Sequence, residues 1–136
     1  MNELEINRVY ELEKLSMLLP QVGIATDHLI HAGMYARTIV IPKDVVLTGA
    51  LIKVATILII NGDVNVNGTR FTGYNVLAAN KNRKQAFHAL EDTSLTMIFR
   101  TDVDNVADAE EEFTEEASLL ISRKDDSINH ILITGE

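Results

Sequence analysis

Two histidine patterns in the sequence could take part in metal binding or proton transfer. His28 and His31 are three residues apart, and on a helix this spacing would place both imidazoles on one face. A zinc site needs at least three protein ligands, and no third ligand is evident beside this pair. We therefore interpret the two histidines as polar side chains in a loop, with two ligands of a metal as the alternative.

His88 is the second pattern, because Glu91 and Asp92 follow it. An acid that orients an imidazole can make it a general base. The same order of residues is expected where a histidine at the end of a strand borders a charged turn, and this is the interpretation that we favour.

The basic residues offer two further candidates. Lys81, Arg83 and Lys84 form the basic cluster of an acidic chain. The cluster could hold a phosphate-bearing ligand or the acidic surface of a neighbouring subunit, or it could lie in a solvated loop. Lys53 lies in an apolar stretch. If its side chain points inward it must be paired or have a lowered pKa, and if it points outward it is a strand lysine that discourages aggregation.

The acidic run from Asp108 to Glu116 raises the possibility of calcium binding. It lacks the alternating oxygen ligands and the turn glycine of a calcium loop. We therefore expect these acids to form the solvated face of a helix.

A helix must come first among the elements that position these residues. Residues 2–19 are expected to be helical, and the helix is expected to end at Pro20. Residues 21–33 are expected to form a linker. The helical prediction depends on apolar residues that share one side: Val9, Leu12, Leu15 and Leu19.

Short β-type runs separated by turn residues fill the middle of the chain. Asn61-Gly62 and Asn67-Gly68 are both typical of hairpin turns, because a type I′ turn needs positive φ at two successive residues. Turn signals about every 8–12 residues, with this many short strands, predict an antiparallel sandwich or small barrel. The expected strands are residues 35–41, 45–48, 51–60, 63–67, 70–77, 85–90 and 94–101.

The pattern changes again after the last of these runs. Apolar residues spaced three and four apart predict a helix over residues 104–124, with Asp104 or Asn105 as its N-cap. Residues 125–127 are expected to form a turn, and residues 128–134 alternate as a final strand.

The composition limits the classes of protein to consider. The chain has 136 residues, with 12 Lys+Arg against 20 Asp+Glu and a net charge of −8, which suits one domain over residues 1–136. The absence of Cys excludes disulfides, thiolate zinc sites, iron–sulfur clusters and cysteine nucleophiles. The acidic charge argues against broad nucleic-acid binding. No apolar run is long enough for a membrane helix, and no signal-like segment opens the chain.

Several short motifs lie in a recognisable order: residues 31–37, Ile41-Pro42 with Leu47-Thr48-Gly49, residues 59–64, Gly68, Gly73, residues 89–93 and the acidic residues 110–112. Together they resemble a small cupin of a type often carried by bacteriophages. The resemblance implies an antiparallel jelly-roll barrel of about six to eight strands. That barrel would span residues 34–101, with the two helices and the final strand outside it.

Cupins that carry out chemistry usually bind a metal inside the barrel, through two His and a Glu in one motif and a His in a second. The first motif would fall between Gly49 and Gly62, where residues 50–57 contain no His, Glu, Asp or Cys. In the second motif Gln85 takes the ligand position, and His88 falls on the opposite face of the strand. The resemblance therefore implies a cupin barrel with no metal and no cofactor.

The function predicted from these observations is that of a non-enzymatic, metal-free structural or binding module. The resemblance implies a phage-encoded protein of the host cytoplasm or the virion. Its expected partners are further copies of the chain, phage structural proteins or a small anionic ligand, with no nucleic acid and no membrane. Self-association is expected because both helices and the terminal strand carry apolar faces that must be covered.

The alternative is a metal-independent acid/base enzyme that acts on a sugar or a nucleotide sugar, or a barrel that binds a small anion. The catalytic candidates are then His88 with Tyr35 or Tyr74. Inward orientation of His88 and a tyrosine across one pocket would favour the enzyme. The expected ligand-binding residues are Lys53, Arg37, Gln85 and His88.

Overall fold

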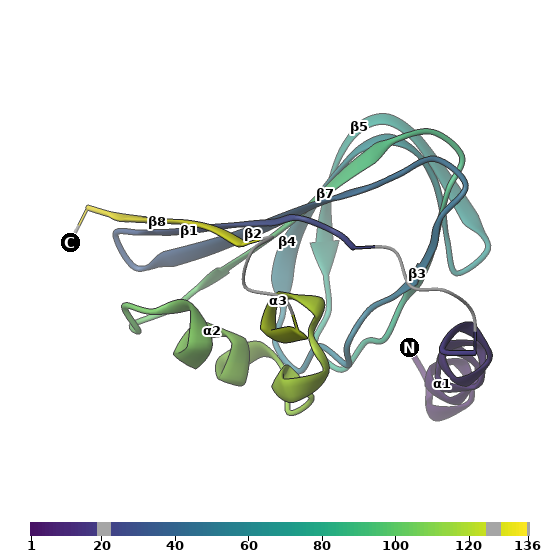
Figure 1. Cartoon of the computed structure of the whole chain (residues 1–136), viewed down its shortest axis with the longest axis horizontal. Coiled ribbons are helices and arrows are strands. Elements are labelled where there is room, and N and C mark those ends of the chain that lie inside the picture. The colour runs from purple at the N-terminus through teal and green to yellow at the C-terminus, as the bar shows by residue number, and fades with distance from the viewer. Residues whose placement is uncertain (19–22, 125–128, 136) are drawn as a thin grey trace.

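The strands of the chain form one curled sheet with helical segments against its concave side (Figure 1). The computed structural model describes residues 1–18, 23–124 and 129–135. Within these residues the elements, in chain order, are α1 (Glu3–Ser16), β1 (Thr26–His31), β2 (Met34–Ile41), β3 (Val46–Thr48), β4 (Thr56–Val66), β5 (Thr69–Ala79), β6 (Ala86–Ala89), β7 (Thr93–Arg100), α2 (Val106–Phe113), the 3₁₀ turn η1 (Ala117–Leu119), α3 (Ile121–Lys124) and β8 (Asn129–Thr134).

The order of strands in the sheet is β3-β6-β4-β7-β2-β1-β8, and β5 pairs with β4 on its other side. The prediction of a mainly β fold with an N-terminal helix and a further helix after the strands is confirmed. All strand pairs within residues 34–101, the span expected for the antiparallel barrel, are antiparallel, and β8, expected outside that barrel, runs parallel to β1. The sheet curls into a half-barrel, and its concave side faces α2 and α3 (Figure 1).

The interior of the half-barrel is aliphatic with a small aromatic group. Inward-facing residues alternate with outward ones along the central strands β4 and β7, as expected for a sheet with one covered face. Tyr35, Phe99 and Phe113 meet edge-on or stacked beneath the sheet, with ring centroids 5.5–6.5 Å apart. α2 thus closes this end of the core through Phe113.

The second of the two expected hairpin turns is confirmed, and the first is wrong. Asn67 and Gly68 both have positive φ, 49° and 91°, between β4 and β5. At Asn61-Gly62, by contrast, β4 continues without a turn. Gly62 has φ 150°, and a Cβ there would lie 2.6 Å from Thr93 Oγ1 and 2.8 Å from a β7 backbone atom. The glycine therefore permits close approach of β7 instead of reversing the chain.

The segment expected to be a linker contains a strand. β1 alternates strictly between buried and exposed positions and pairs with β2 and β8. His28 therefore points inward and His31 outward, because residues three apart on a strand lie on opposite faces. The interpretation of both histidines as loop side chains is wrong because they lie on β1, and their opposite faces also exclude the alternative that they bind one metal together.

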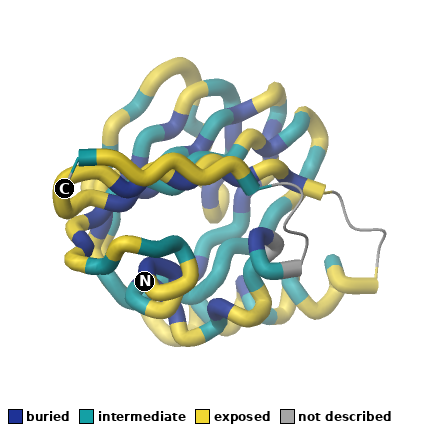
Figure 2. Tube along the Cα trace, turned by 60° about the vertical axis from the view of Figure 1, so that its left-hand side comes forward, coloured by how far each residue is buried: buried dark blue, intermediate teal, exposed yellow. Residues whose placement is uncertain are grey.

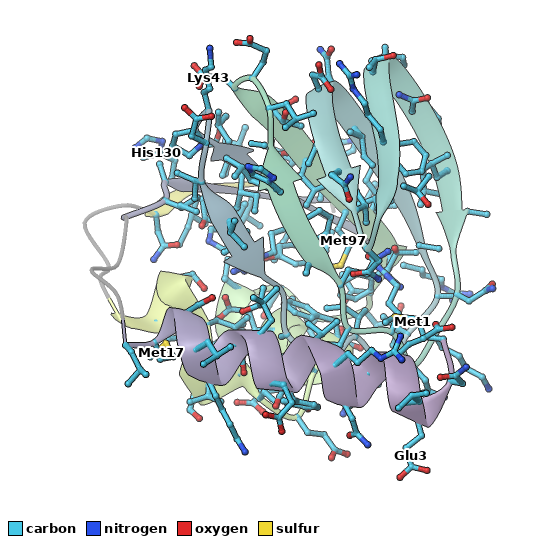
Figure 3. The ribbon with its side chains drawn as sticks, turned by 90° about the vertical axis from the view of Figure 1, so that its right-hand side faces the viewer. Met1, Glu3, Met17, Lys43, Met97 and His130 are labelled. Atoms are coloured by element: carbon cyan, nitrogen blue, oxygen red, sulfur yellow. The ribbon has the colours of Figure 1, made fainter. Side chains whose placement is uncertain are left out.

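The N-terminal helix α1 lies across one end of the curled sheet (Figure 3). Asn2 caps it by accepting a hydrogen bond from the Glu5 N–H, as an N-cap residue does. Of the apolar side expected from the sequence, Val9 is buried, at 6% exposed, whereas Leu12 is 36% exposed. Leu15 is 64% exposed. The expected helix end at Pro20, like the turn at residues 125–127, lies outside the described residues.

Polar groups hold α1 in place. Lys84, 1% exposed, donates from Nζ to Glu13 Oε2 at 3.0 Å and to the Gly49 carbonyl at 2.9 Å. The same ammonium lies 4.2 Å from the centre of the Tyr10 ring and 3.5 Å from Glu116 Oε1. Lys84 therefore joins α1 to the β3 segment and to the α2–η1 segment.

The helix expected over residues 104–124 is divided into three short pieces. Asn105 caps α2 by accepting from the Asp108 N–H, as predicted. Thr114 leaves the helical region, with φ −150° and ψ 148°, and its hydroxyl accepts from the Glu116 N–H. Such a local side-chain bond competes with helix continuation. No helix in the part of the chain that the structure describes is long and apolar enough to cross a membrane.

Candidate binding pocket

A cavity of about 170 Å³ lies on the concave side of the half-barrel. Its walls are mostly apolar, and Met97 of β7 lies among them, in the interior above α1 (Figure 3). An apolar cavity of about 150 Å³ is large enough to hold benzene. The polar side chains in its lining are Thr26, Arg37, Thr48, Arg83 and Gln85.

Among the residues that the structure describes, the lining contains two arginines and no aspartate or glutamate. This is unusual in a chain with a net charge of −8. The two guanidinium groups differ in whether a carboxylate compensates their charge, and this difference determines the charge that the pocket presents.

Arg83 is 5% exposed and has only uncharged hydrogen-bond acceptors. Nη1 donates to the carbonyls of Val54 and Asn80, at 3.1 and 2.8 Å, and Nη2 donates to Thr56 Oγ1 at 2.7 Å. Nε is buried without a partner among the described residues. Burial lowers the pKa of Arg83 to about 10, which leaves the guanidinium charged at neutral pH.

Arg37, in contrast, is neutralised by Glu110 of α2. Its Nη1 donates to Glu110 Oε2 at 2.8 Å, and Nη2 donates to Ser122 Oγ at 3.0 Å. The guanidinium also lies over the Phe113 ring, 5.5 Å from its centre. Glu110 in turn accepts from Arg123 Nε at 2.9 Å. These contacts fix Arg37 against the helical side of the pocket.

Tyr35 and His28 form a buried pair behind Arg37. The Asn129 side chain donates to the Ser122 carbonyl, so its Oδ1 faces His28 Nε2 at 2.7 Å and accepts the Nε2 proton. His28 Nδ1 is then free to accept from the Tyr35 hydroxyl at 2.6 Å. Burial lowers the pKa of His28, although the hydrogen bond that its Nε2 donates to Asn129 favours the charged form. Both groups are committed to structural hydrogen bonds.

The candidate residues named from the sequence fall in different places. Arg37 and Gln85 line the pocket, and Tyr35 is fully buried beside it. His88 is exposed on β6, opposite Asn65 in the β4–β6 register. Its side chain therefore does not reach a tyrosine across the pocket.

The other two candidates also lie away from the pocket lining. Tyr74 is 67% exposed on β5. Lys53 lies before β4, not within it as expected from the sequence, because its backbone N–H donates to the Phe113 carbonyl. Its Nζ is 4.0 Å from Glu115 Oε1 at the surface. Neither residue contributes to the lining.

Sequence reasoning grouped Arg83 with a basic surface cluster and gave it no role of its own. The residue next to it, Lys84, is buried in a different place, under α1. In an extended segment, successive side chains point to opposite sides, so neighbouring residues can lie in different surroundings. Within residues 1–18, 23–124 and 129–135, no three His, Cys, Asp or Glu side chains lie close enough to hold a metal ion.

The observed architecture is a mainly β half-barrel with helical segments on its concave side. Two solved structures are similar to it. One is KdgF from a Halomonas species, with 19% identity over 60% of this chain and 82% of that chain, and a TM-score of 0.48. The other is the Clostridium difficile EutQ protein, with 16% identity over 68% of this chain and 73% of that chain, and a TM-score of 0.45.

No protein-family model matches the chain, and the comparison with curated proteins gives no match. The two structural similarities concern the fold and carry no information about a ligand or a reaction. Function must therefore be argued from the pocket itself.

Proposed function

We propose that this chain is a small-molecule-binding module whose half-barrel pocket holds its ligand without altering it chemically. The observation that carries the proposal is the cavity of about 170 Å³ with apolar walls and a few convergent polar groups. Ligand pockets in proteins have this composition.

The described residues of the lining include no acid or base suited to catalysis, which supports binding over catalysis. Acid/base catalysis works best with a group whose pKa lies near the working pH. Within the described part of the chain, Arg37 and Arg83 are the ionisable side chains of the lining. Tyr35 and His28, the one tyrosine–histidine pair near the pocket among the described residues, are bound to each other and do not line it.

Ligand-observed NMR with two small probes, hexanoate and hexanamide, tests this proposal. We expect saturation transfer to at least one probe. Ala50→Leu places a larger side chain in the lining and should remove the signal, whereas Ala78→Leu on the exposed side of β5 should not. The proposal is wrong if neither probe gives a signal, or if Ala50→Leu leaves the signal unchanged.

Self-association is a second property that we propose, and β8 supports it. β8 forms an edge of the sheet and is exposed along almost its whole length (Figure 2). Ile131, Leu132 and Ile133 are 50–59% exposed. The only ionisable side chain of this strand, His130, is already paired with Asp27 of its own chain at 3.0 Å. An edge of this kind is a template for another strand.

The occupant that we propose is the β8 strand of a second copy, in an antiparallel arrangement about Leu132. Such a contact is isologous and closes as a dimer. Light scattering after size exclusion should give the mass of a dimer for the wild type and of a monomer for Leu132→Lys. Val76→Lys, on the exposed side of β5, is the matched control and should stay dimeric. A wild-type monomer would rule out this contact. A virion-associated role stays a prediction, because it depends on partners outside the chain.

A further inference from the structure

The charge of the pocket is not shared equally between its two arginines. Glu110 cancels the charge of Arg37 at a contact of 2.8 Å. No described carboxylate lies within ion-pair distance of Arg83. The lining therefore carries one uncompensated positive charge.

The hydrogen bonds of Arg83 leave a defined pair of donors. A guanidinium has five N–H groups, and three of them are used by Val54, Asn80 and Thr56. The buried Nε–H and one Nη2–H remain without a partner among the described residues. The guanidinium therefore keeps its full positive charge and spare donor capacity, which a carboxylate can match.

A buried, unpaired charge is costly for the protein. The three neutral acceptors orient the Arg83 guanidinium but do not neutralise it. An apolar residue at position 83, or an acid beside it, would avoid this cost if the fold were the only requirement. The arrangement is instead that of a preorganised anion site, in which the counter-charge arrives with the ligand.

The rest of the lining restricts the remainder of the ligand. Away from Arg83 the polar lining residues Thr26, Thr48 and Gln85 are uncharged, and the charge of Arg37 is already compensated by Glu110. A dianion would therefore bury one negative charge without a free cationic partner. An apolar body in this position would lose water-exposed surface, which is favourable.

We infer that the pocket selects an organic monocarboxylate, with its carboxylate on Arg83 and an apolar body against β2, β4 and β7. This inference rests on the proposed binding function and names the ligand class of the same pocket. Arg37 is a positioning residue that shapes the wall through Phe113 and does not anchor the ligand.

Three probes of equal carbon number test the inference on the full chain at neutral pH. Hexanoate is the monoanion, hexanamide its neutral analogue and adipate its dianionic analogue. Hydrogen bonds to a charged group are worth about 1.5–3 kcal/mol. We therefore expect the Kd of hexanoate, from NMR titration, to be at least about tenfold lower than that of either other probe.

A variant series assigns the preference to one residue. Arg83→Met should abolish the preference of the pocket for hexanoate over hexanamide, while Arg70→Met should preserve it. Arg70 is an exposed arginine paired with Asp63 outside the pocket. Far-UV circular dichroism checks that each variant is folded. If Arg83→Met does not fold, the ratio of the wild-type affinities for hexanoate and hexanamide still tests the inference.

The outcomes separate this inference from the proposed function. Equal affinities for hexanoate and hexanamide, both weakened by Ala50→Leu, would overturn the monocarboxylate assignment and leave the binding function in place. Tighter binding of adipate would also overturn the assignment. If none of the three probes binds, both proposals are wrong.

Discussion

Replacing Glu110 with glutamine should destabilise the protein strongly. The Glu110 side chain is 3% exposed and accepts hydrogen bonds from Arg37, Arg123 and Ser122. Glu110→Gln keeps the shape of the side chain and removes its charge. The Arg37 guanidinium, only 13% exposed, is then left without a counter-charge. Breaking a buried ion pair from one side costs about 3–5 kcal/mol, so we expect a loss of roughly 3 kcal/mol or more in the free energy of unfolding.

Urea denaturation followed by far-UV circular dichroism measures this loss. Glu111→Gln is the matched control, because it makes the same chemical change at the next residue. Glu111 is 59% exposed and contacts Arg123 at 3.1 Å, so its loss should be below about 1 kcal/mol, as for other surface pairs. Equal losses for the two variants would refute the reasoning, since burial of the pair would then contribute nothing.

The pH dependence of the difference between wild type and Glu110→Gln follows from the pKa of Glu110. Burial would raise this pKa, but hydrogen bonds from Ser122, Arg123 and Arg37 outweigh burial and lower it. A carboxylate with a lowered pKa stabilises the fold fully above its unfolded value, about 4.3. That contribution disappears as the pH falls through the lower, folded value. The difference in stability should therefore be constant near neutrality and shrink in acid below about pH 4.

Three further changes test other parts of the fold. Lys84→Met removes a buried ammonium that joins α1 to the sheet and should lower the free energy of unfolding by roughly 3 kcal/mol. Glu13→Gln, at a carboxylate that is 30% exposed, should lower it by about 1 kcal/mol. Urea titration compares the two variants. Gly62→Ala forces a Cβ against β7 and should cost about 2–3 kcal/mol, while Gly68→Ala, in open space, should cost about 1 kcal/mol for its left-handed backbone alone. Burial lowers the pKa of His28. The stability that neutral His28 contributes is therefore complete above about pH 6.5 and is lost as the pH falls toward the folded pKa. His28→Gln should abolish this loss in the same titrations.

Periodicity in the sequence was enough to predict most of the fold. The strand regions from β2 to β7 and the cap of α2 at Asn105 depend on short-range patterns. Two failures have a common cause. The Asn-Gly pair at residues 61–62 looks like a turn, yet Gly62 serves a contact with β7 thirty residues away. β1 was missed because its apolar alternation becomes meaningful only when β2 and β8 lie beside it.

The pocket was harder to predict than the fold. Gln85 was named because the cupin resemblance gives it a ligand position, and Arg37 was named as a ligand-binding candidate; both line the cavity. Arg83 and Lys84 looked equivalent as members of a basic run, but one lines the cavity and the other lies under α1. Their different roles come from partners far away in sequence, such as Thr56 and Glu13. No local pattern contains that information.

The contrast between the two arginines makes Glu110 the residue that sets the charge of the pocket. With Glu110 ionised, Arg37 is neutralised and only Arg83 can hold an anion. In the folded fraction of Glu110→Gln, Arg37 becomes a second unpaired guanidinium in the same lining. Adipate should then bind at least about tenfold more tightly than it does to the wild type, because each carboxylate meets a charged donor. Hexanamide, which carries no charge, should bind both forms alike. If adipate also binds both forms alike, Glu110 does not control the charge that the ligand meets.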